Sequence, residues 1–196
     1  MRTRPTVAFV AVAVTLALSA SAQQPQKAPT ADEMIAMAVE RARPGPEHKL
    51  LEALTGTFKQ EITWSFPGMP PLKHSGTSEN RWILGGRFLQ CSSVGDGPAR
   101  PFEGLTIYGY DTRKKQYFAL GIDTTGTYYV TPHGTYAGAS RSFILKGEEL
   151  SEIGDGTFKY TMTIRAEGPD RHVIDFVFEF PGRDPMKVLE IVHTRR

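Results

Sequence analysis

The sequence has very little cysteine, almost no surplus charge and no long apolar run beyond its first residues. Its single cysteine, Cys91, excludes an internal disulfide, and we expect it to be a small buried residue in a strand. None of the five histidines shows the spacing of metal ligands, which argues against a zinc site. No Ser/His/Asp constellation, phosphate-binding glycine loop or glycosidase carboxylate pair is recognisable, so no catalytic motif assigns a reaction.

The first 22 residues have the pattern of a secretory signal peptide. Arg2 and Arg4 precede an apolar run from Val7 to Leu18, and Ala20-Ser21-Ala22 forms an A-x-A cleavage site. The run is shorter than the roughly 20 residues of a membrane span, and no cysteine closely follows it to carry a lipid anchor. The sequence therefore predicts a periplasmic or secreted protein without membrane contact after cleavage. The alternative is an uncleaved N-terminal anchor.

Without this leader the chain is electrically balanced, with 21 basic residues against 21 acidic ones. A balanced chain has no electrostatic footprint for nucleic acid, so we expect no nucleic-acid partner. The length that remains suits one domain with one hydrophobic core.

The residues before Gly56 predict a tether and one or two short helices. A polar stretch at 23–29 leads to a capping box, Thr30-x-x-Glu33, which predicts a helix over about 31–43. Pro44-Gly45 ends this helix, and a second short helix is predicted up to Leu54. The predicted organisation is a signal peptide at 1–22, a tether with a short helix at 23–43, and a barrel domain at 44–196.

From Gly56 onward apolar and polar residues alternate, which is the period of β-strands. Gly85-Gly86 between two such runs predicts a two-residue hairpin turn, because a type I′ turn needs positive φ at both central positions. The same plan repeats to the end of the chain. It predicts strands over about 58–66, 74–84, 87–94, 102–111, 116–124, 126–136, 142–150, 158–165, 174–180 and 186–195.

Consecutive hairpins form a meander, and a meander of this length exposes two sheet edges unless it closes. We therefore predict an all-β fold: a ten-stranded antiparallel up-and-down β-barrel, with the second helix plugging one end. The alternative is a two-sheet sandwich, which usually needs longer Greek-key crossovers than the sequence provides.

Two motifs stand out, Gly56-Thr57-Phe58 after a leucine-rich helix and Thr77-Ser-Glu-Asn-Arg-Trp-Ile-Leu-Gly-Gly-Arg-Phe-Leu89. Weaker ones are Phe102-Glu-Gly104, Gly109-Tyr-Asp111, Lys115-x-Tyr117, Ile122-Asp123-x-x-Gly-Thr127 and Val188-Leu-Glu190. Together they resemble an uncharacterised bacterial calycin-like family, a domain of unknown function, over about Pro44 to Arg196. The resemblance implies a lipocalin- or nitrobindin-like barrel, and no activity.

Two residues depart from the pattern of similar proteins. Phe58 stands where calycins favour tryptophan, and it keeps an aromatic plug at this point. Gly121 stands where similar proteins often carry a bulky aromatic residue, which implies either a larger interior or a β-bulge.

Our functional hypothesis is a non-enzymatic barrel that binds a small, largely apolar molecule and needs no cofactor. A few polar groups inside such a barrel orient the ligand, and buried charges must be paired. In the central motif Glu79 and Arg81 share one face of a strand, while Asn80 and Trp82 share the other. The candidate ligand-binding residues are Glu79, Arg81, Trp82, Arg87, Tyr110, Asp123 and Glu190.

Several alternatives remain open. The charged candidates are either a structural ion-pair cluster or simply exposed. An enzyme at the barrel mouth, an isomerase or hydrolase, would use Glu79 or Asp123 as general base. The resemblance to nitrobindin-like barrels implies haem, with His193 as its axial ligand. A structural or protein-binding module would have a filled interior and an outer apolar patch. The sequence assigns neither a ligand identity nor an oligomeric state.

Overall fold

The computed structural model describes residues 28–97, 101–151, 156–180 and 182–196. The chain divides into two units, Met1–Arg41 and Ala42–Arg196. The predicted signal peptide lies outside the described residues. In the first unit, helix α1 (Ala31–Arg41) begins with the expected capping box. The amide of Glu33 donates to Thr30 Oγ1 at 3.2 Å, and the amide of Thr30 donates to Glu33 Oε2 at 2.7 Å. Among the described residues we find no helix with the length and apolar character to span a bilayer.

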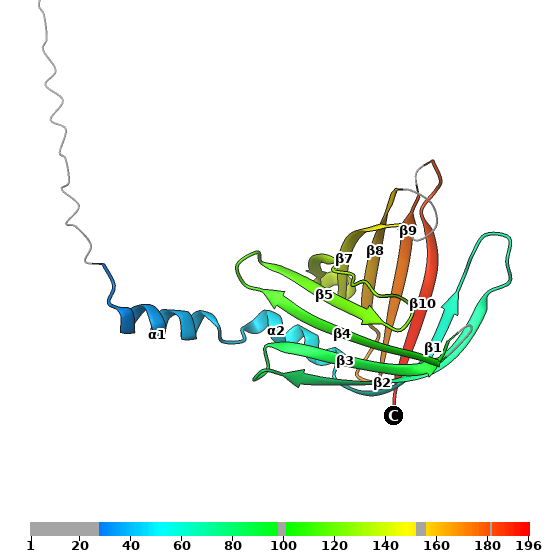
Figure 1. The fold of residues 1–196 in the computed structure, drawn as a ribbon. Coiled ribbons are helices and arrows are strands. Elements are labelled where there is room, and N and C mark those ends of the chain that lie inside the picture. The colour runs from blue at the N-terminus through cyan, green and yellow to red at the C-terminus, as the bar shows by residue number, and fades with distance from the viewer. Residues whose placement is uncertain (1–27, 98–100, 152–155, 181) are drawn as a thin grey trace, which may run out of the picture. The chain divides into compact units, whose positions relative to one another are not determined.

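Ten antiparallel strands of the second unit close into a barrel, as predicted (Figure 1). They are β1 (Gly56–Trp64), β2 (Leu72–Ile83), β3 (Phe88–Asp96), β4 (Pro101–Asp111), β5 (Gln116–Asp123), β6 (His133–Ala137), β7 (Ser142–Leu150), β8 (Thr157–Ala166), β9 (Arg171–Glu179) and β10 (Met186–Arg195). Each strand pairs with its sequence neighbours, and β1 pairs with β10. Closure satisfies the edges that a meander would leave exposed, which excludes the two-sheet sandwich.

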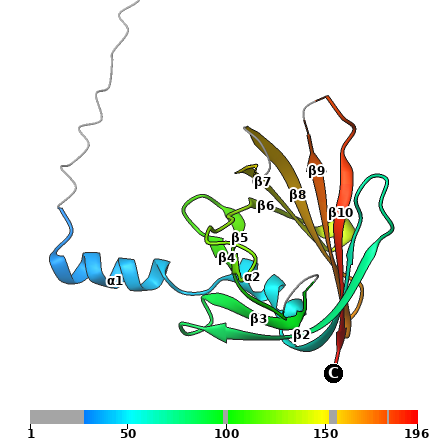
Figure 2. The same cartoon turned by 45° about the vertical axis from the view of Figure 1, so that its right-hand side comes forward.

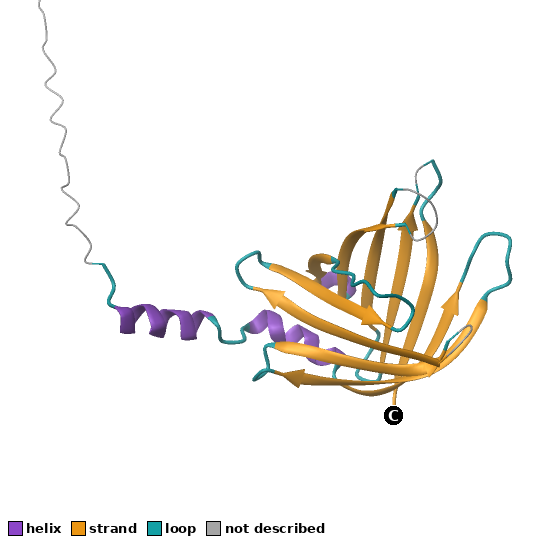
Figure 3. Cartoon of the chain, in the orientation of Figure 1, coloured by secondary structure: helices purple, strands orange, loops and turns teal. Residues whose placement is uncertain are grey.

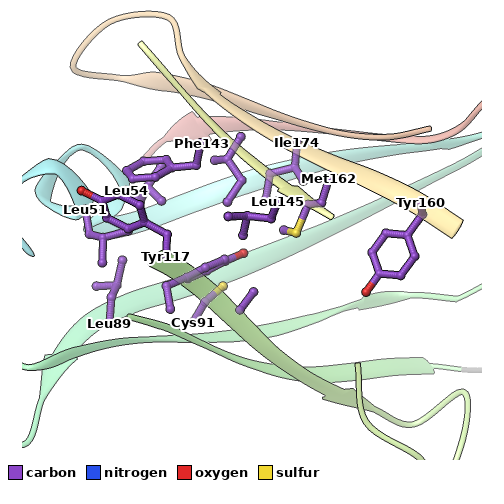
Figure 4. Packing of buried hydrophobic residues seen from close by; sticks show 13 residues of the cluster. Leu51, Leu54, Leu89, Cys91, Tyr117, Phe143, Leu145, Tyr160, Met162 and Ile174 are labelled. Carbon is purple, nitrogen blue, oxygen red and sulfur yellow. The ribbon is translucent and has the colours of Figure 1, made fainter. Parts of the chain in front are cut away.

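The plug predicted for one end of the barrel consists of α2 (Pro46–Leu50) and the 3₁₀ helix η1 (Leu51–Leu54) (Figure 3). Leu51 and Leu54 are each 2% exposed and belong to the hydrophobic core. Figure 4 shows both leucines at one end of this core, near Leu89. A helical segment this short gains its stability from such packing rather than from its own hydrogen bonds.

Phe58, the aromatic residue of the Gly-x-aromatic motif, is fully buried beside the plugged end. The guanidinium of Arg195 lies 4.9 Å from the centre of its ring and donates to the carbonyl of Thr55 at 3.0 Å. Gly56 has a φ of 121°, and a Cβ at this position would collide with the guanidinium of Arg195. The Gly-x-aromatic motif therefore allows an arginine to lie beneath the aromatic ring.

The central hairpin differs from the prediction in its turn. Strand β2 ends at Ile83 and β3 begins at Phe88, so four residues rather than two form the connection. Leu84, Gly85 and Gly86 all have positive φ, of 49°, 67° and 78°. The Gly-Gly pair supplies the left-handed conformation as expected, but the turn includes one residue on each side of it.

Strand β6 is much shorter than the predicted strand at 126–136. It begins at His133, and its register with β5 consists of Tyr117↔Gly134 and Phe118↔His133. Pro132 directly precedes it and has no amide hydrogen to donate to a ladder. Beyond this pairing an isolated bridge joins Gly121 to Val130.

Candidate ligand-binding site

The lumen of the barrel has two parts that differ in packing. In the closed half, next to α2 and η1, inward-facing residues are buried: Phe58 and Leu89 are 0% exposed and Ile164 is 1% exposed. In the open half, at the opposite ends of the strands, the inward-facing Trp64 and Phe176 are only half-buried. Inward-facing rings inside a closed barrel stay half-exposed only where nothing packs across from them. The inward side chains are therefore completely buried at one end and only partly buried at the other.

Four aromatic residues on β8 and β9, Phe158, Tyr160, Phe176 and Phe178, form one side of the open half, and we call them the aromatic wall. The rings of Phe158 and Phe178 stack with centroids 4.9 Å apart. The ring of Tyr160 lies 6.1 Å from those of Phe176 and Phe178. Tyr160 stands apart from the remaining core in Figure 4. The wall is a continuous apolar surface inside the barrel.

The strands across the lumen from the aromatic wall carry small inward-facing residues. In the ring of strands β3 stands opposite β8, and Figures 1 and 2 show β2–β5 and β7–β10 as two separate sides. The inward positions of β2–β5 toward the open end are Leu72, His74, Gly76, Ser78, Ser93, Gly95, Phe102, Gly104, Thr106, Gly121 and Asp123. Most of them are small, and the ring of Phe102 lies over Gly104, where a Cβ would be 2.8 Å from it.

The sequence left open whether Gly121 marks a β-bulge or a position with more space in the interior. It pairs with Thr106 in an uninterrupted β4–β5 register, so it does not mark a β-bulge. It is on the inner face, and a Cβ at this position would lie 3.1 Å from Cγ2 of Val130, so Val130 occupies part of the space that a larger residue would need.

A buried polar cluster lies between the two halves, on β10, β9 and β1. The rings of His172 and His193 stack at 4.1 Å, and both are 2% exposed. The side chain of Gln60 contacts His193 Nε2 at 2.9 Å and donates to Ser93 Oγ at 3.2 Å. Burial lowers the pKa of His172 to about 2, helped by the neighbouring His193, and lowers the pKa of His193 to about 4. Both imidazoles are therefore neutral at neutral pH.

This environment does not fit a haem bound through His193. Its Nε2 faces Gln60, one ring face is covered by His172, and the Phe58 ring lies edge-on at 6.0 Å. An axial ligand needs a free nitrogen with room for the iron and its macrocycle beside it. His193 is therefore not placed to serve as the axial ligand of a haem. Among the described residues, no group of three or more His, Cys, Asp or Glu is placed to hold a metal ion.

The alternation on β2 places the charged and uncharged residues of the central motif on opposite sides. Glu79 and Arg81 are exposed on the outer face, so our expectation that they anchor a ligand inside the barrel is wrong. Asn80 and Trp82 face inward. Asn80 Nδ2 donates to the carbonyl of Leu54 at 2.7 Å, and Trp82 Nε1 donates to Glu52 Oε2 at 2.7 Å. These two side chains hold the plug in place and do not reach the open half.

Three more candidates also lie away from the open half. Arg87 is in the β2–β3 turn, where its Nη1 donates to the carbonyl of Leu84 at 3.1 Å. Glu190 is on the outer face of β10 and pairs with Lys187, which lowers the pKa of Glu190. Tyr110 packs against Tyr117, with ring centroids 4.9 Å apart, beside the plug.

Asp123 is the predicted site residue that does face inward at the open end, on the last position of β5. It is exposed, and its Oδ1 accepts hydrogen bonds from the amide and the hydroxyl of Thr125. The alternative of an isomerase or hydrolase at the barrel mouth requires a carboxylate shielded from water as its general base. Neither Asp123 nor Glu79 is shielded in this way, because both side chains are exposed.

Comparison with known proteins identifies the family. One described as "Protein of unknown function (DUF1579)" matches residues 43–195. The chain belongs to the DUF1579 family. No curated protein matches its sequence. The matched range agrees closely with the extent of the calycin-like resemblance.

Solved structures show that other proteins share the fold of this DUF1579 barrel. Rv2717c from M. tuberculosis has 14% sequence identity and a TM-score of 0.56, over 79% of this chain and 99% of that one. The S-type phycobiliprotein lyase CPES from Guillardia theta has 9% identity and a TM-score of 0.52, over 81% of this chain and 96% of that one. At such identities the similarity shows the fold alone.

Glu149 is an inward-facing residue of the DUF1579 barrel that sequence reasoning missed. It is half-buried on β7, directly opposite Phe158 in the register, and Tyr160 Oη donates to its Oε1 at 3.4 Å. The alternation that starts with the buried Phe143 and Leu145 leads to position 149 on the same face. That alternation was the signal that could have identified it.

The outer surface has a separate apolar feature near the open end. A shallow depression of about 380 Å³ is lined by Ser92, Ser93, Val94, Glu103, Gly104, Leu105, Ile122, Asp123 and Thr124. Most of these side chains belong to the outward rows of β3–β5, and Val94 and Ile122 are 54% and 46% exposed. The depression therefore lies outside the lumen.

Proposed function

We propose that this protein binds a small, mainly apolar molecule in the open half of its barrel, against the aromatic wall. The observation that carries the proposal is the half-exposure of Phe158, Phe176 and Phe178 on the inner face of a closed barrel. Ligand pockets are typically concave and apolar, with a few polar groups that orient the ligand. Covering apolar surface is worth about 25 cal/mol per Å², so a ligand that covers these rings gains binding free energy from their desolvation.

Two further features support a binding function over a purely structural one. Most inward residues across the lumen toward the open end are glycine, serine or threonine, so few large side chains, Phe102 among them, face the aromatic wall. A structural barrel gains stability from a filled interior, so an unfilled half is costly unless a ligand occupies it. In addition, one protein of similar fold is named a phycobiliprotein lyase, which fits a ligand-binding barrel.

The test measures binding of N-phenyl-1-naphthylamine, a neutral apolar fluorophore whose emission rises when it leaves water. We expect saturable binding to the purified protein. Gly121→Phe restores a ring on the inner face, and Phe178→Ala removes one from the aromatic wall. Each should weaken binding at least about tenfold, a loss of about 1.4 kcal/mol, because the added ring occupies space that the ligand needs and the removed ring takes away apolar contact area.

The matched control is Val177→Ala, which changes the neighbouring residue on the outer face of β9. It should bind the fluorophore as the unmodified protein does. Circular dichroism and urea unfolding verify that each variant is folded. Folded protein without saturable binding, or equal binding by Gly121→Phe and Phe178→Ala, would overturn the proposal.

We also propose that the protein is exported, on the basis of the Arg2–Ala22 pattern. Expressed with its full sequence in a Gram-negative host, it should be recovered from the periplasm or medium with a mass that begins at Gln23. Arg2→Glu combined with Arg4→Glu should retain it in the cytoplasm, because the positive charges precede the apolar run that the export machinery reads. A full-length mass in the periplasmic fraction would contradict cleavage.

A further inference from the structure

The charges on the inner face of the open half are all of one sign. Among the described strands, the inward positions toward the open end carry two carboxylates, Glu149 and Asp123, and no lysine or arginine. The basic residues of these strand segments face outward, for example Lys146, Lys159 and Lys187. Arg195 faces inward only beneath Phe58, at the plugged end. The open half is thus an apolar space with acidic groups inside it.

Glu149 is the carboxylate next to the aromatic wall. It lies opposite Phe158, and Tyr160 Oη donates to its Oε1 at 3.4 Å. Burial, with the charge of Glu149, raises the pKa of the Tyr160 hydroxyl, so this hydroxyl remains protonated and able to donate. Among the described residues no lysine or arginine forms an ion pair with Glu149, whereas Asp175 and Glu190 on the outer face both pair with Lys187.

A glycine shapes this corner of the lumen. Gly147 pairs with Tyr160, and a Cβ at Gly147 would collide with the tyrosine ring. The ring therefore lies across β7 over the glycine, which brings its hydroxyl to Glu149. The result is a half-buried carboxylate bordered by aromatic rings, with Phe158 and Phe178 stacked beside it.

We propose that the ligand carries a positive charge, an amine or quaternary ammonium group, which lies between Glu149 and the aromatic wall. This inference rests on the proposed function and specifies its substrate class. A cation over aromatic faces gains about 0.5 to 2 kcal/mol, and a carboxylate acts as its counter-ion. The apolar remainder of the ligand occupies the space toward Gly104 and Gly121.

The same arrangement disfavours anionic ligands such as fatty acids. A carboxylate in the open half would lie near Glu149 and Asp123, and the described inward residues there include no lysine or arginine; His74 on β2 is the histidine on this face. His172 and His193 supply no positive charge, because burial keeps them neutral. Specificity of this kind comes from the repulsion of the wrong charge as much as from attraction of the right one.

The experiment displaces N-phenyl-1-naphthylamine with three competitors that share one alkyl chain: decyltrimethylammonium, decanol and decanoate, each below its micellar concentration. We expect the ammonium compound to compete about tenfold better than the alcohol, and the carboxylate to compete worst. Glu149→Gln should reduce the advantage of the ammonium compound over the alcohol to about twofold. Glu148→Gln, on the outer face of the same strand, is the matched control and should leave the order unchanged.

The outcomes separate this inference from the proposed function. Saturable fluorophore binding with equal displacement by the three competitors, or with decanoate as the best, overturns the cation preference and leaves the apolar site intact. An ammonium preference that persists in Glu149→Gln overturns the role of this carboxylate. If the folded protein does not bind the fluorophore and none of the compounds binds in isothermal calorimetry, the proposed function itself fails.

Discussion

The two halves of the lumen are built from the same strands and differ in what packs across from them. In the closed half, Leu51 and Leu54 of the plug fill the space between the strands, and the inward side chains are almost completely buried. In the open half no helix enters, and rings such as Phe176 remain half-exposed. One part of the barrel therefore supplies the stability and the other supplies a surface for a ligand, as expected when functional sites are less optimised for stability than the core.

The strongest test of this comparison removes one phenylalanine from each half. Phe58→Ala should destabilise the protein by about 3–5 kcal/mol, because it leaves a cavity under a fully buried ring. Phe178→Ala should cost only about 1 kcal/mol, because its ring is already half-exposed. Urea unfolding monitored by circular dichroism measures both. Equal losses at the two positions would contradict the division into a filled and an unfilled half.

The next test uses acid. His172 and His193 have pKa values of about 2 and about 4 in the fold, below the ordinary value of 6.5. Below that ordinary value the unfolded chain binds protons that the folded chain does not, so stability should fall as pH drops from 6.5 toward 4. Each histidine should contribute up to about 1.4 kcal/mol per pH unit in this range, and nothing above it.

Unfolding free energies of the unmodified protein and of His172→Gln, measured across this range, check the acid prediction. The variant should show a shallower slope than the unmodified protein. Should His172→Gln fail to fold, ring signals in NMR give the same information, since two of the five histidines should not titrate between pH 7 and 5. Identical slopes, or five normal titrations, would rule out the buried neutral pair.

A smaller effect is expected where the plug meets β2. Asn80→Ala removes the hydrogen bond to the Leu54 carbonyl and should cost about 1–2 kcal/mol, because that buried acceptor loses its side-chain donor. Glu79→Ala changes the adjacent outward residue and should have almost no effect on the unfolding free energy. If Glu79→Ala proved the more damaging of the two, the assignment of the two faces of β2 would be wrong.

The smallest effect is expected on the outer face of β10. Glu190→Gln breaks a partly exposed ion pair with Lys187 and should change stability by at most about 0.5 kcal/mol, with a loss that shrinks as salt is added. The fluorophore should bind to this variant as before, because the side chain lies outside the lumen. Weakened binding would show that the outer face takes part in the site.

The barrel and its plug could be predicted from the sequence because the core residues alternate strictly. Phe58 and Gln60, for example, are buried on β1 while Lys59 and Glu61 are exposed, as period two predicts. The face of β2 that points inward could not be predicted in the same way. Both of its faces are polar, with Ser78 and Asn80 on one side and Glu79 and Arg81 on the other, and the neighbouring strands decide between them.

The candidate site was the least predictable part. Glu79 and Arg81 of the central motif were predicted to bind a ligand because charges inside a barrel are usually functional. Both side chains are exposed on the outer face. Glu149 was not predicted as a site residue, because a glutamate at the end of a strand and next to Glu148 has the pattern of a solvated turn. Its role depends on the ring of Tyr160, which is eleven residues away in the sequence and reaches it only because Gly147 has no side chain.

The pairing of β5 with β6 involves few residues, so the barrel wall is held less firmly between these two strands than between the others. Neighbouring strands elsewhere are held over most of their length, whereas Tyr117 and Phe118 are the β5 residues in register with β6. Three further backbone hydrogen bonds extend this seam, from the amide of Ala119 to the carbonyl of Pro132 and between Gly121 and Val130 in both directions, so these amides should be protected from hydrogen exchange. This side of the barrel thus depends on a few scattered main-chain bonds, and we expect it to open before the long ladders of β7–β10 as denaturant is added.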